Sequence, residues 1–242
     1  MASVLNIGSR LEAIVDLCPA TKIIADIGCD HGYVACELVL QSKAEMVIAT
    51  EKSLDCLNKA VSLADSINIM PFISFRQGDG FEAVTKYDKL NCAVIAGMGG
   101  VEIIKILSKK PKKLYDFVLQ PQSDVILLRR YLVENKFNII VDKLVKDGDK
   151  YYNVLRVTKG RCNLADLELY FGKTNFTDNY IVFYEYLTQR QKKLVDFKAE
   201  VGGLSNKLQQ ELDYVNAAIG LFETSSDQAD TDKPNTDKKD NA

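Results

Sequence analysis

The sequence predicts an α/β protein with a doubly wound parallel sheet, followed by a helical C-terminal part. Three patterns support this prediction. Short apolar runs alternate with helix-like segments up to about residue 134. Two strand-like segments then flank an Asp-Gly pair, which is typical of an antiparallel hairpin. Beyond Leu164, apolar residues recur at spacings of three and four, as on one face of a helix.

The elements of the sheet follow one another along the chain. A short amphipathic helix over 11–17 ends before Pro19, which cannot continue a helix. Apolar runs predict parallel strands over 23–27, 46–50, 72–75, 93–96 and 117–119. The segments between them predict helices over 33–40, over 53–64 with Ser53 as the cap, from the fourth strand to 107, and over 124–134.

Two further strand-like segments, 137–145 and 151–157, close the sheet. Gly148 lies between them and supplies the positive φ that a hairpin turn needs. The apolar stripes after 164 predict a helical hairpin that turns at Gly202-Gly203, although one long helix bent at these glycines remains open. We therefore divide the chain into a domain over 1–160, a helical hairpin over 161–222 and a disordered polar tail over 223–242.

Composition limits the classes of protein that the chain can belong to. Its 242 residues are 47% hydrophobic, enough for a full core, but no apolar run reaches the length of a membrane span. The N-terminus also lacks the layout of a signal peptide. Six scattered cysteines without a CxxC pair predict a reduced, cytoplasmic protein. With one histidine, a transition-metal centre is not expected.

The distribution of charge bears on the choice of partner. A net charge of −2 at first argues against nucleic acid, but acidic residues gather after Glu223. Basic residues gather earlier in two groups, Lys105, Lys109, Lys110, Lys112 and Lys113, and Arg190, Lys192 and Lys193. Either group alone is more often a solvated face than a binding site. A polyanionic substrate would give both groups a function.

Candidate ligand-binding residues follow the predicted strands, because ligands of parallel sheets lie beyond the carboxyl ends. Gly28 and Gly32 would let the backbone approach a cofactor, although such a pair can be an ordinary turn. Glu51 is spaced to accept hydrogen bonds from ribose hydroxyls, or is simply an exposed acid at a strand end. Asp79, before Gly80, suits an adenine amino group as well as it suits a plain Asp-Gly turn.

Two more loops carry candidate residues. Asp26 precedes the glycine turn, so we expect its carboxylate to stay ionised and to support the loop or contact a cofactor amine. Gly97 and Met98 follow the fourth strand in a loop without a side chain that could accept from a substrate amine. The backbone of that loop must then position the substrate, and Asp30 of the first loop could supply the carboxylate.

Four motifs in this order carry a specific resemblance: D-I-G-C-D-H-G-Y over 26–33, R-Q-G-D-G over 76–80, A-G-M-G-G over 96–100 and L-Q-P-Q over 119–122. With Ser9-Arg10-Leu11 and the L-Y-F-G of 169–172, they resemble the bacterial TrmK family over about residues 5–222. Gly32 stands where many relatives have alanine, and Gln122 where asparagine is common.

The resemblance implies a class I methyltransferase domain that is dependent on S-adenosyl-L-methionine (SAM), with five parallel strands, a terminal antiparallel hairpin and a C-terminal coiled-coil hairpin. It also implies methyl transfer to N1 of adenosine 22 in tRNA. N1 carries a lone pair, so alignment with the methyl group is the main requirement. We hypothesise that Asp30 holds the N6 amine, although it could instead cap the next helix. His31 and Tyr33 would shape the base pocket, and Gln120 would contact the substrate.

The partner would be tRNA, without membrane or metal, and the oligomeric state is open. Arg190, Lys192 and Lys193, together with Lys198 and Lys207, are candidates to bind tRNA phosphates, unless the hairpin serves packing or dimerisation. Two alternatives remain at this stage. One is a non-catalytic RNA-binding protein on a methyltransferase scaffold. The other, a nicotinamide-dependent oxidoreductase, is disfavoured by the terminal hairpin and by the missing GxGxxG.

Overall fold

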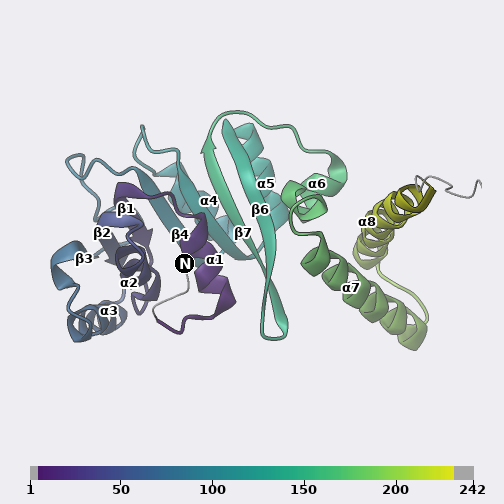
Figure 1. The fold of residues 1–242 in the computed structure, drawn as a ribbon, viewed down its shortest axis with the longest axis horizontal. Coiled ribbons are helices and arrows are strands. Elements are labelled where there is room, and N and C mark those ends of the chain that lie inside the picture. The colour runs from purple at the N-terminus through teal and green to yellow at the C-terminus, as the bar shows by residue number, and fades with distance from the viewer. Residues whose placement is uncertain (1–4, 232–242) are drawn as a thin grey trace, which may run out of the picture. The chain divides into compact units, whose positions relative to one another are not determined.

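The computed structural model describes residues 5–231, where the chain forms a seven-stranded sheet in the order β3-β2-β1-β4-β5-β7-β6 (Figure 1). Parallel pairing joins β1 (Thr21–Ile27), β2 (Ala44–Glu51), β3 (Ile73–Gln77), β4 (Cys92–Gly99) and β5 (Phe117–Ser123). The hairpin of β6 (Phe137–Asp147) and β7 (Lys150–Lys159) adds to β5 through antiparallel pairing. The predicted sheet and its closing hairpin are confirmed.

Helices cover both faces of this sheet. One face packs against α1 (Gly8–Leu17), α2 (Tyr33–Leu40) and α3 (Leu54–Ser66), and the other against α4 (Gly100–Ser108) and α5 (Val125–Glu134). A short 3-10 turn, η1 (Met70–Phe72), leads into β3. Side chains alternate between the two cores, so that Val94 faces the first while Ala93 and Ile95 face the second. Burial on both faces explains why these strands are continuously apolar in the sequence.

The carboxyl ends of β4 and β5 run further than the apolar pattern predicts. Met98 pairs with Pro121, and the register shifts on either side of this pair. Proline has no N–H for a regular ladder, and such irregular positions are where a strand tolerates it. The consequence is that the Gly-Met-Gly and Gln-Pro-Gln segments are held side by side instead of being separate loops.

The first compact unit ends at Asn179, later than the predicted boundary at 160. The added segment contains α6 (Asp166–Phe171) and the 3-10 turn η2 (Lys173–Phe176). Its carbonyls at 169 and 170 accept hydrogen bonds from the buried Arg129, at 3.3 and 2.6 Å. Arg129 also forms an ion pair with Asp142 at 2.6 Å. A buried guanidinium needs several acceptors, so this segment belongs with the sheet.

The second unit contains α7 (Tyr180–Val201) and α8 (Asn206–Thr231), which form a helical hairpin. Gly202, with φ +74°, lies between them, as predicted. Arg190 binds Glu211 through two bonds of 2.6 and 2.9 Å, and Gln191 binds Asn216 at 2.8 Å. These contacts exclude a single bent helix.

The far end of α8 differs from the predicted tail. The helix continues to Thr231, although the sequence predicts disorder from 223. Extending an existing helix needs no new nucleus, so a polar segment can follow an apolar one. The rest of that tail, 232–242, lies outside the described residues. Within the described part, none of the helices is long and apolar enough to span a membrane.

Candidate active site

Two adjacent cavities lie at the carboxyl edge of the parallel strands. The first has a volume of about 310 Å³ and the second about 220 Å³, and Gly28 and Met98 line both. The first is also lined by residues of α1, of the carboxyl-end parts of β1, β4 and β5, and of the segment that follows β1, including Arg10, Asp26, Asp30, His31, Tyr33, Gly97 and Gln122. The second is lined by Glu51, Asp79, Gly80 and Glu102, among others. Most of the predicted site residues therefore meet here.

The two glycines of the first loop have different roles. Gly28 has φ +73°, and a Cβ there would lie 2.2 Å from the Met98 methyl carbon. The backbone thus passes directly against Met98, between the two cavities. Gly32 lines neither cavity, contrary to the prediction. A Cβ at Gly32 would lie 2.7 Å from the Cβ of Ala60, so this glycine permits close packing of the first loop on α3.

Glu51 is fixed at the end of β2 by two backbone donors. Its Oε2 accepts from the N–H of Asp30 at 3.2 Å, and its Oε1 accepts from the N–H of Ser53 at 2.9 Å. Asp79 lines the same cavity, next to Gly80, whose carbonyl accepts from the Thr50 hydroxyl at 3.2 Å. The second cavity therefore holds carboxylates, those of Glu51 and Asp79 among them, that can accept hydrogen bonds from a polar ligand such as a nucleoside.

Asp26 lies at the base of the first cavity and is only 3% exposed. Its Oδ2 accepts no hydrogen bond from any described residue. Burial raises the pKa of Asp26 to about 7, and the nearby charges of Glu51 and Asp30 add to this effect, while the N–H of Ala35 opposes it. The direction of this shift is opposite to the prediction that Asp26 stays ionised. A buried oxygen without a donor suits the ammonium group of a ligand.

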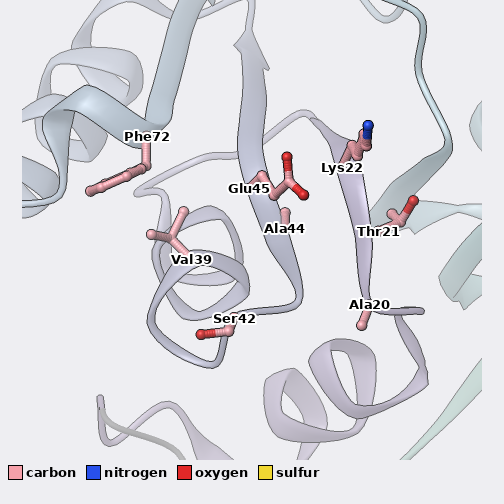
Figure 2. Close-up of a pocket in the computed structure, with 8 residues that line it drawn as sticks. All are labelled: Ala20, Thr21, Lys22, Val39, Ser42, Ala44, Glu45 and Phe72. Atoms are coloured by element: carbon pink, nitrogen blue, oxygen red, sulfur yellow. The ribbon is translucent and has the colours of Figure 1, made fainter.

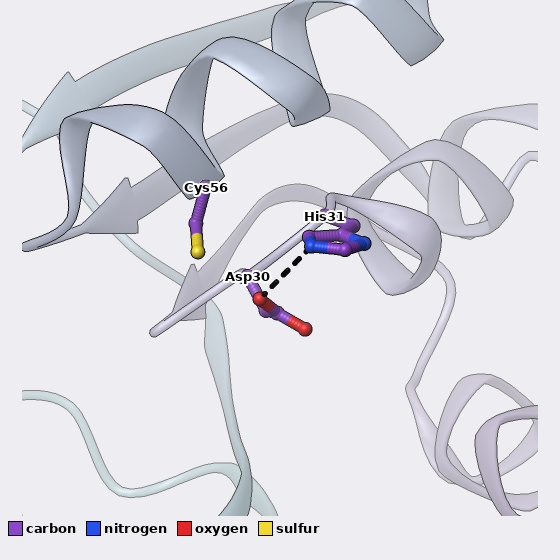
Figure 3. Close-up of side chains that lie close together, drawn as sticks. All are labelled: Asp30, His31 and Cys56. Atoms are coloured by element: carbon purple, nitrogen blue, oxygen red, sulfur yellow. Dashed lines mark ion pairs between the residues drawn. The ribbon is translucent and has the colours of Figure 1, made fainter.

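Asp30 lines the first cavity. It has φ +49°, and 71% of its side chain is exposed. The N-cap of α2 is Gly32, and no side chain caps this helix, so the alternative of Asp30 as a helix cap is excluded. His31 Nε2 lies 3.6 Å from Asp30 Oδ1 (Figure 3). Tyr33 lines the same cavity. The carboxylate is thus available to a substrate.

Gln120 does not contact the cavity, although the resemblance predicts a substrate-binding residue. It is fully buried, and its Oε1 accepts from the Arg10 guanidinium at 2.8 Å and from the N–H of Gly97 at 3.2 Å. It therefore helps to hold Gly97, near the carboxyl end of β4, in place. Arg10 and Gln122 line the cavity instead, and sequence reasoning assigned neither to the site. Arg10 lies in the Ser9-Arg10-Leu11 motif, which was the available signal.

A larger cavity of about 700 Å³ lies at the opposite edge of the sheet (Figure 2). It is lined by the first residues of β1 and β2, including Thr21, Lys22, Ala44 and Glu45. No predicted site residue lines it. Since ligands of parallel sheets bind at the carboxyl ends, its size alone does not make it the site.

The basic residues that are predicted to bind tRNA lie in the second unit, and their contacts differ. Arg190 is paired with Glu211 in a bidentate ion pair, so its charge already serves the contact between α7 and α8. Lys192 and Lys193 are exposed. In the other basic group, Lys110 lies 3.8 Å above the Tyr115 ring, and partial burial lowers its pKa. These two, Arg190 and Lys110, are structural.

Comparison with known proteins decides what this edge of the sheet is for. Residues 24–224 match the TrmK family, described as tRNA (adenine(22)-N(1))-methyltransferase. The chain belongs to this family. A putative tRNA methyltransferase of Mycoplasma pneumoniae is 37% identical over 172 residues, covering 68% of this chain and 79% of that protein. The tRNA (adenine(22)-N(1))-methyltransferase of Bacillus subtilis is 32% identical, covering 64% of this chain and 66% of that protein.

Solved structures agree with the TrmK assignment. A putative tRNA (m1A22) methyltransferase of Streptococcus pneumoniae, in complex with S-adenosyl-L-methionine, matches with a TM-score of 0.78 and 25% identity. The match covers 87% of this chain and 98% of that one. The resemblance, the class I methyltransferase fold and the predicted activity are thereby confirmed. The nicotinamide-dependent alternative is set aside.

Proposed function

We propose that this TrmK family member transfers a methyl group from SAM to N1 of adenosine 22 in tRNA, with Asp30 as the residue that holds the target base. One observation carries the assignment of Asp30. Its carboxylate is exposed at the first cavity, which Gly97 and Met98 of β4 also line, and it caps no helix. This end of β4 offers no carboxylate of its own in the cavity.

The residues of the two cavities fit SAM. The cofactor supplies an electrophilic methyl group on a sulfonium. Glu51 and Asp79 are suited to accept from its ribose hydroxyls and adenine amine in the second cavity. The unpaired oxygen of Asp26 is suited to its ammonium group in the first. Gly28 and Met98 line both cavities, so the sulfonium, which lies between these two ends of SAM, would be placed beside them.

The main catalytic requirement is that the protein aligns adenine N1 with the methyl group. Adenine N1 has a lone pair and attacks without losing a proton first, so orientation is the main contribution. The N6 amine becomes more acidic as positive charge develops on the ring. Asp30 accepts a hydrogen bond from N6–H, which orients the base and stabilises that charge. Tyr33 and His31 form walls of the same cavity and limit the positions open to the base.

Methylation at N1 requires that the RNA expose this atom. N1 lies on the Watson–Crick edge, so adenosine 22 must be unpaired or extruded before it enters the cavity. A cavity of this size accommodates one base, and contacts elsewhere must recognise the tRNA body. Lys192 and Lys193 are exposed and suited to bind phosphates. A cytoplasmic location, where such a substrate is found, remains a prediction.

Replacement of Asp30 by Asn tests its role without disturbing the backbone, because asparagine also tolerates the φ of +49°. We expect kcat for tRNA methylation to fall about 100-fold, since the negative charge is lost, with the Kd for SAM unchanged. Asp55→Asn, which changes an exposed acid in the first turn of α3, is the matched control and should keep wild-type turnover. Near-full turnover in Asp30→Asn would reject the assignment.

A further inference from the structure

Asp30, His31 and Cys56 form a cluster of possible metal ligands beside the first cavity (Figure 3). One ligand atom from each residue lies within 4.8 Å of the others. Asp30 and His31 belong to the loop after β1, whereas Cys56 lies in the first turn of α3. A search of the sequence for closely spaced ligands misses this set, because its third member comes from another element.

The donor set is chemically suited to one ion. A carboxylate, an imidazole nitrogen and a thiolate are the ligands that Zn²⁺ takes in proteins, with a fourth position left to water. Zinc bonds of about 2.0–2.3 Å place tetrahedral ligand atoms roughly 3.5 Å apart, so the cluster must contract by about 1 Å. The exposed side chain of Asp30 and the 41% exposed side chain of His31 are free to make this adjustment.

The backbone behind the cluster is fixed. The N–H of Asp30 donates to Glu51, and the N–H of Cys56 donates to the Ser53 hydroxyl at 3.3 Å. Glu51 also accepts from the N–H of Ser53, so one carboxylate ties the two segments together. The three ligands are therefore held on a common frame, and only side-chain rotation is needed to close around an ion.

We propose that Asp30, His31 and Cys56 bind one Zn²⁺ ion, and that this ion inhibits methyl transfer by occupying the carboxylate of Asp30. The inhibition, though not the binding, rests on the proposed function of Asp30. Cys56 lines neither cavity, so the methyl transfer itself does not require it. It is the residue that separates zinc binding from catalysis.

Lys59 competes with the ion. Its Nζ lies 3.4 Å from His31 Nε2, and its side chain is exposed. A bound Zn²⁺ must displace this ammonium group from the imidazole and tolerate its charge nearby. Lys59→Gln removes the competing charge, and zinc should bind about threefold more tightly to this variant.

Binding is measured on the full chain by calorimetry with ZnCl₂ and by absorption spectroscopy with Co²⁺, whose thiolate charge-transfer band reports a sulfur ligand. We expect one site in the wild type and a Kd about 100-fold weaker in Cys56→Ala and in His31→Gln, since even outer-shell changes weaken metal sites 10- to 100-fold. Cys162→Ala, which removes another half-buried thiol, should match the wild type. Absence of a site, or equal binding by Cys56→Ala, overturns the proposal.

Measurement of tRNA methylation with and without zinc tests the second half of the proposal. Without zinc, Cys56→Ala should methylate tRNA like the wild type, and added zinc should inhibit the wild type but not this variant. Binding through Cys56 without inhibition overturns the regulatory half. If the protein methylates no tRNA at all, the proposed function fails, while the calorimetric and Co²⁺ results still decide the metal site.

Discussion

Asp26 illustrates how the fold changes the chemistry of a single side chain. The residue lies in β1, one position before the carboxyl end of this apolar strand. In the fold it is enclosed by protein on nearly every side, and burial raises its pKa to about 7. Burial therefore favours the protonated form of this group in the protein alone, and a cationic ligand would favour its ionised form.

The raised pKa of Asp26 predicts how the free energy of unfolding depends on pH. The folded pKa of about 7 lies above the ordinary 3.8, so the native state keeps a proton that the unfolded chain releases. The contribution of Asp26 to stability is full below about pH 4 and is lost as the pH rises to about 7, at up to about 1.4 kcal/mol for each pH unit. Asp26→Asn should abolish this decline in the free energy of unfolding, measured by urea denaturation at several pH values. Parallel pH profiles for the two proteins would contradict the raised pKa.

Gly97 is a second position where one residue governs the site. It has φ +76°, and a Cβ there would meet no atom within 4 Å, because it would point into open space at the first cavity. Gly97→Ala should cost about 1–2 kcal/mol of stability through backbone strain alone, and should weaken SAM binding about tenfold. Calorimetry with SAM and thermal unfolding measure the two effects.

Gly148→Ala is the matched control for Gly97→Ala. Gly148 also has a positive φ, at +59°, and equally open surroundings, but it lies in the β6–β7 turn. We expect a similar loss of stability with no change in the Kd for SAM. If both variants bind SAM like the wild type, Gly97 does not border the cofactor.

At the scale of elements, the sequence pattern assigns the segment after β7 to the helical hairpin, whereas the structure places it in the same unit as the sheet. It carries little periodic pattern, but its carbonyls at 169 and 170 satisfy the buried Arg129. Asn175 also accepts from the N–H of Leu144 at 2.7 Å. α6 and η2 are thus part of the methyltransferase unit and not the start of the hairpin.

Two truncations test this boundary. A chain ending at Asn179 should unfold cooperatively and bind SAM like the full chain, because the first unit is intact. A chain ending at 160 leaves the buried Arg129 without two of its acceptors, and should be destabilised by about 3–5 kcal/mol, as for a broken buried ion network. Circular dichroism melting compares the two. Equal melting temperatures would contradict the role given to 161–179.

Much of the sheet could be predicted from the sequence because its signals are local. The alternation of runs, the Asp147-Gly148 turn and the Ser53 cap each depend on a few neighbouring residues. Glu51 and Asp79 could be placed for the same reason, since a strand end fixes both. Gln120 could not, because its buried contacts with Arg10 and Gly97 join residues that are far apart in the sequence. Likewise, the pKa of Asp26 follows from burial that no local pattern encodes.

At the scale of the whole molecule, one unit carries the cavities and the other carries exposed basic residues. The double variant Lys192→Gln, Lys193→Gln should weaken tRNA binding about tenfold. The slope of log affinity against log salt concentration should fall by the amount expected for the loss of about two phosphate contacts. Its Kd for SAM should not change. Filter binding over a range of salt concentrations measures the tRNA affinity and its salt dependence.

Lys112→Gln, Lys113→Gln is the comparison for that variant, since it neutralises an equally exposed pair in the first unit. If Lys112→Gln, Lys113→Gln weakens tRNA binding and the double variant in the hairpin does not, the helical hairpin is not the tRNA-binding element. The assignment of the two basic groups would then be reversed.

Reverse transcription across methylated tRNA tests the central claim most directly. The protein is incubated with SAM and tRNA transcripts, and an adenosine carrying a methyl group on N1 can no longer pair with an incoming nucleotide. The account predicts a polymerase stop at adenosine 22, lost in a transcript with guanosine at that position and strongly reduced with Asp30→Asn. Full-length products from every transcript, or a stop at another adenosine, would contradict it.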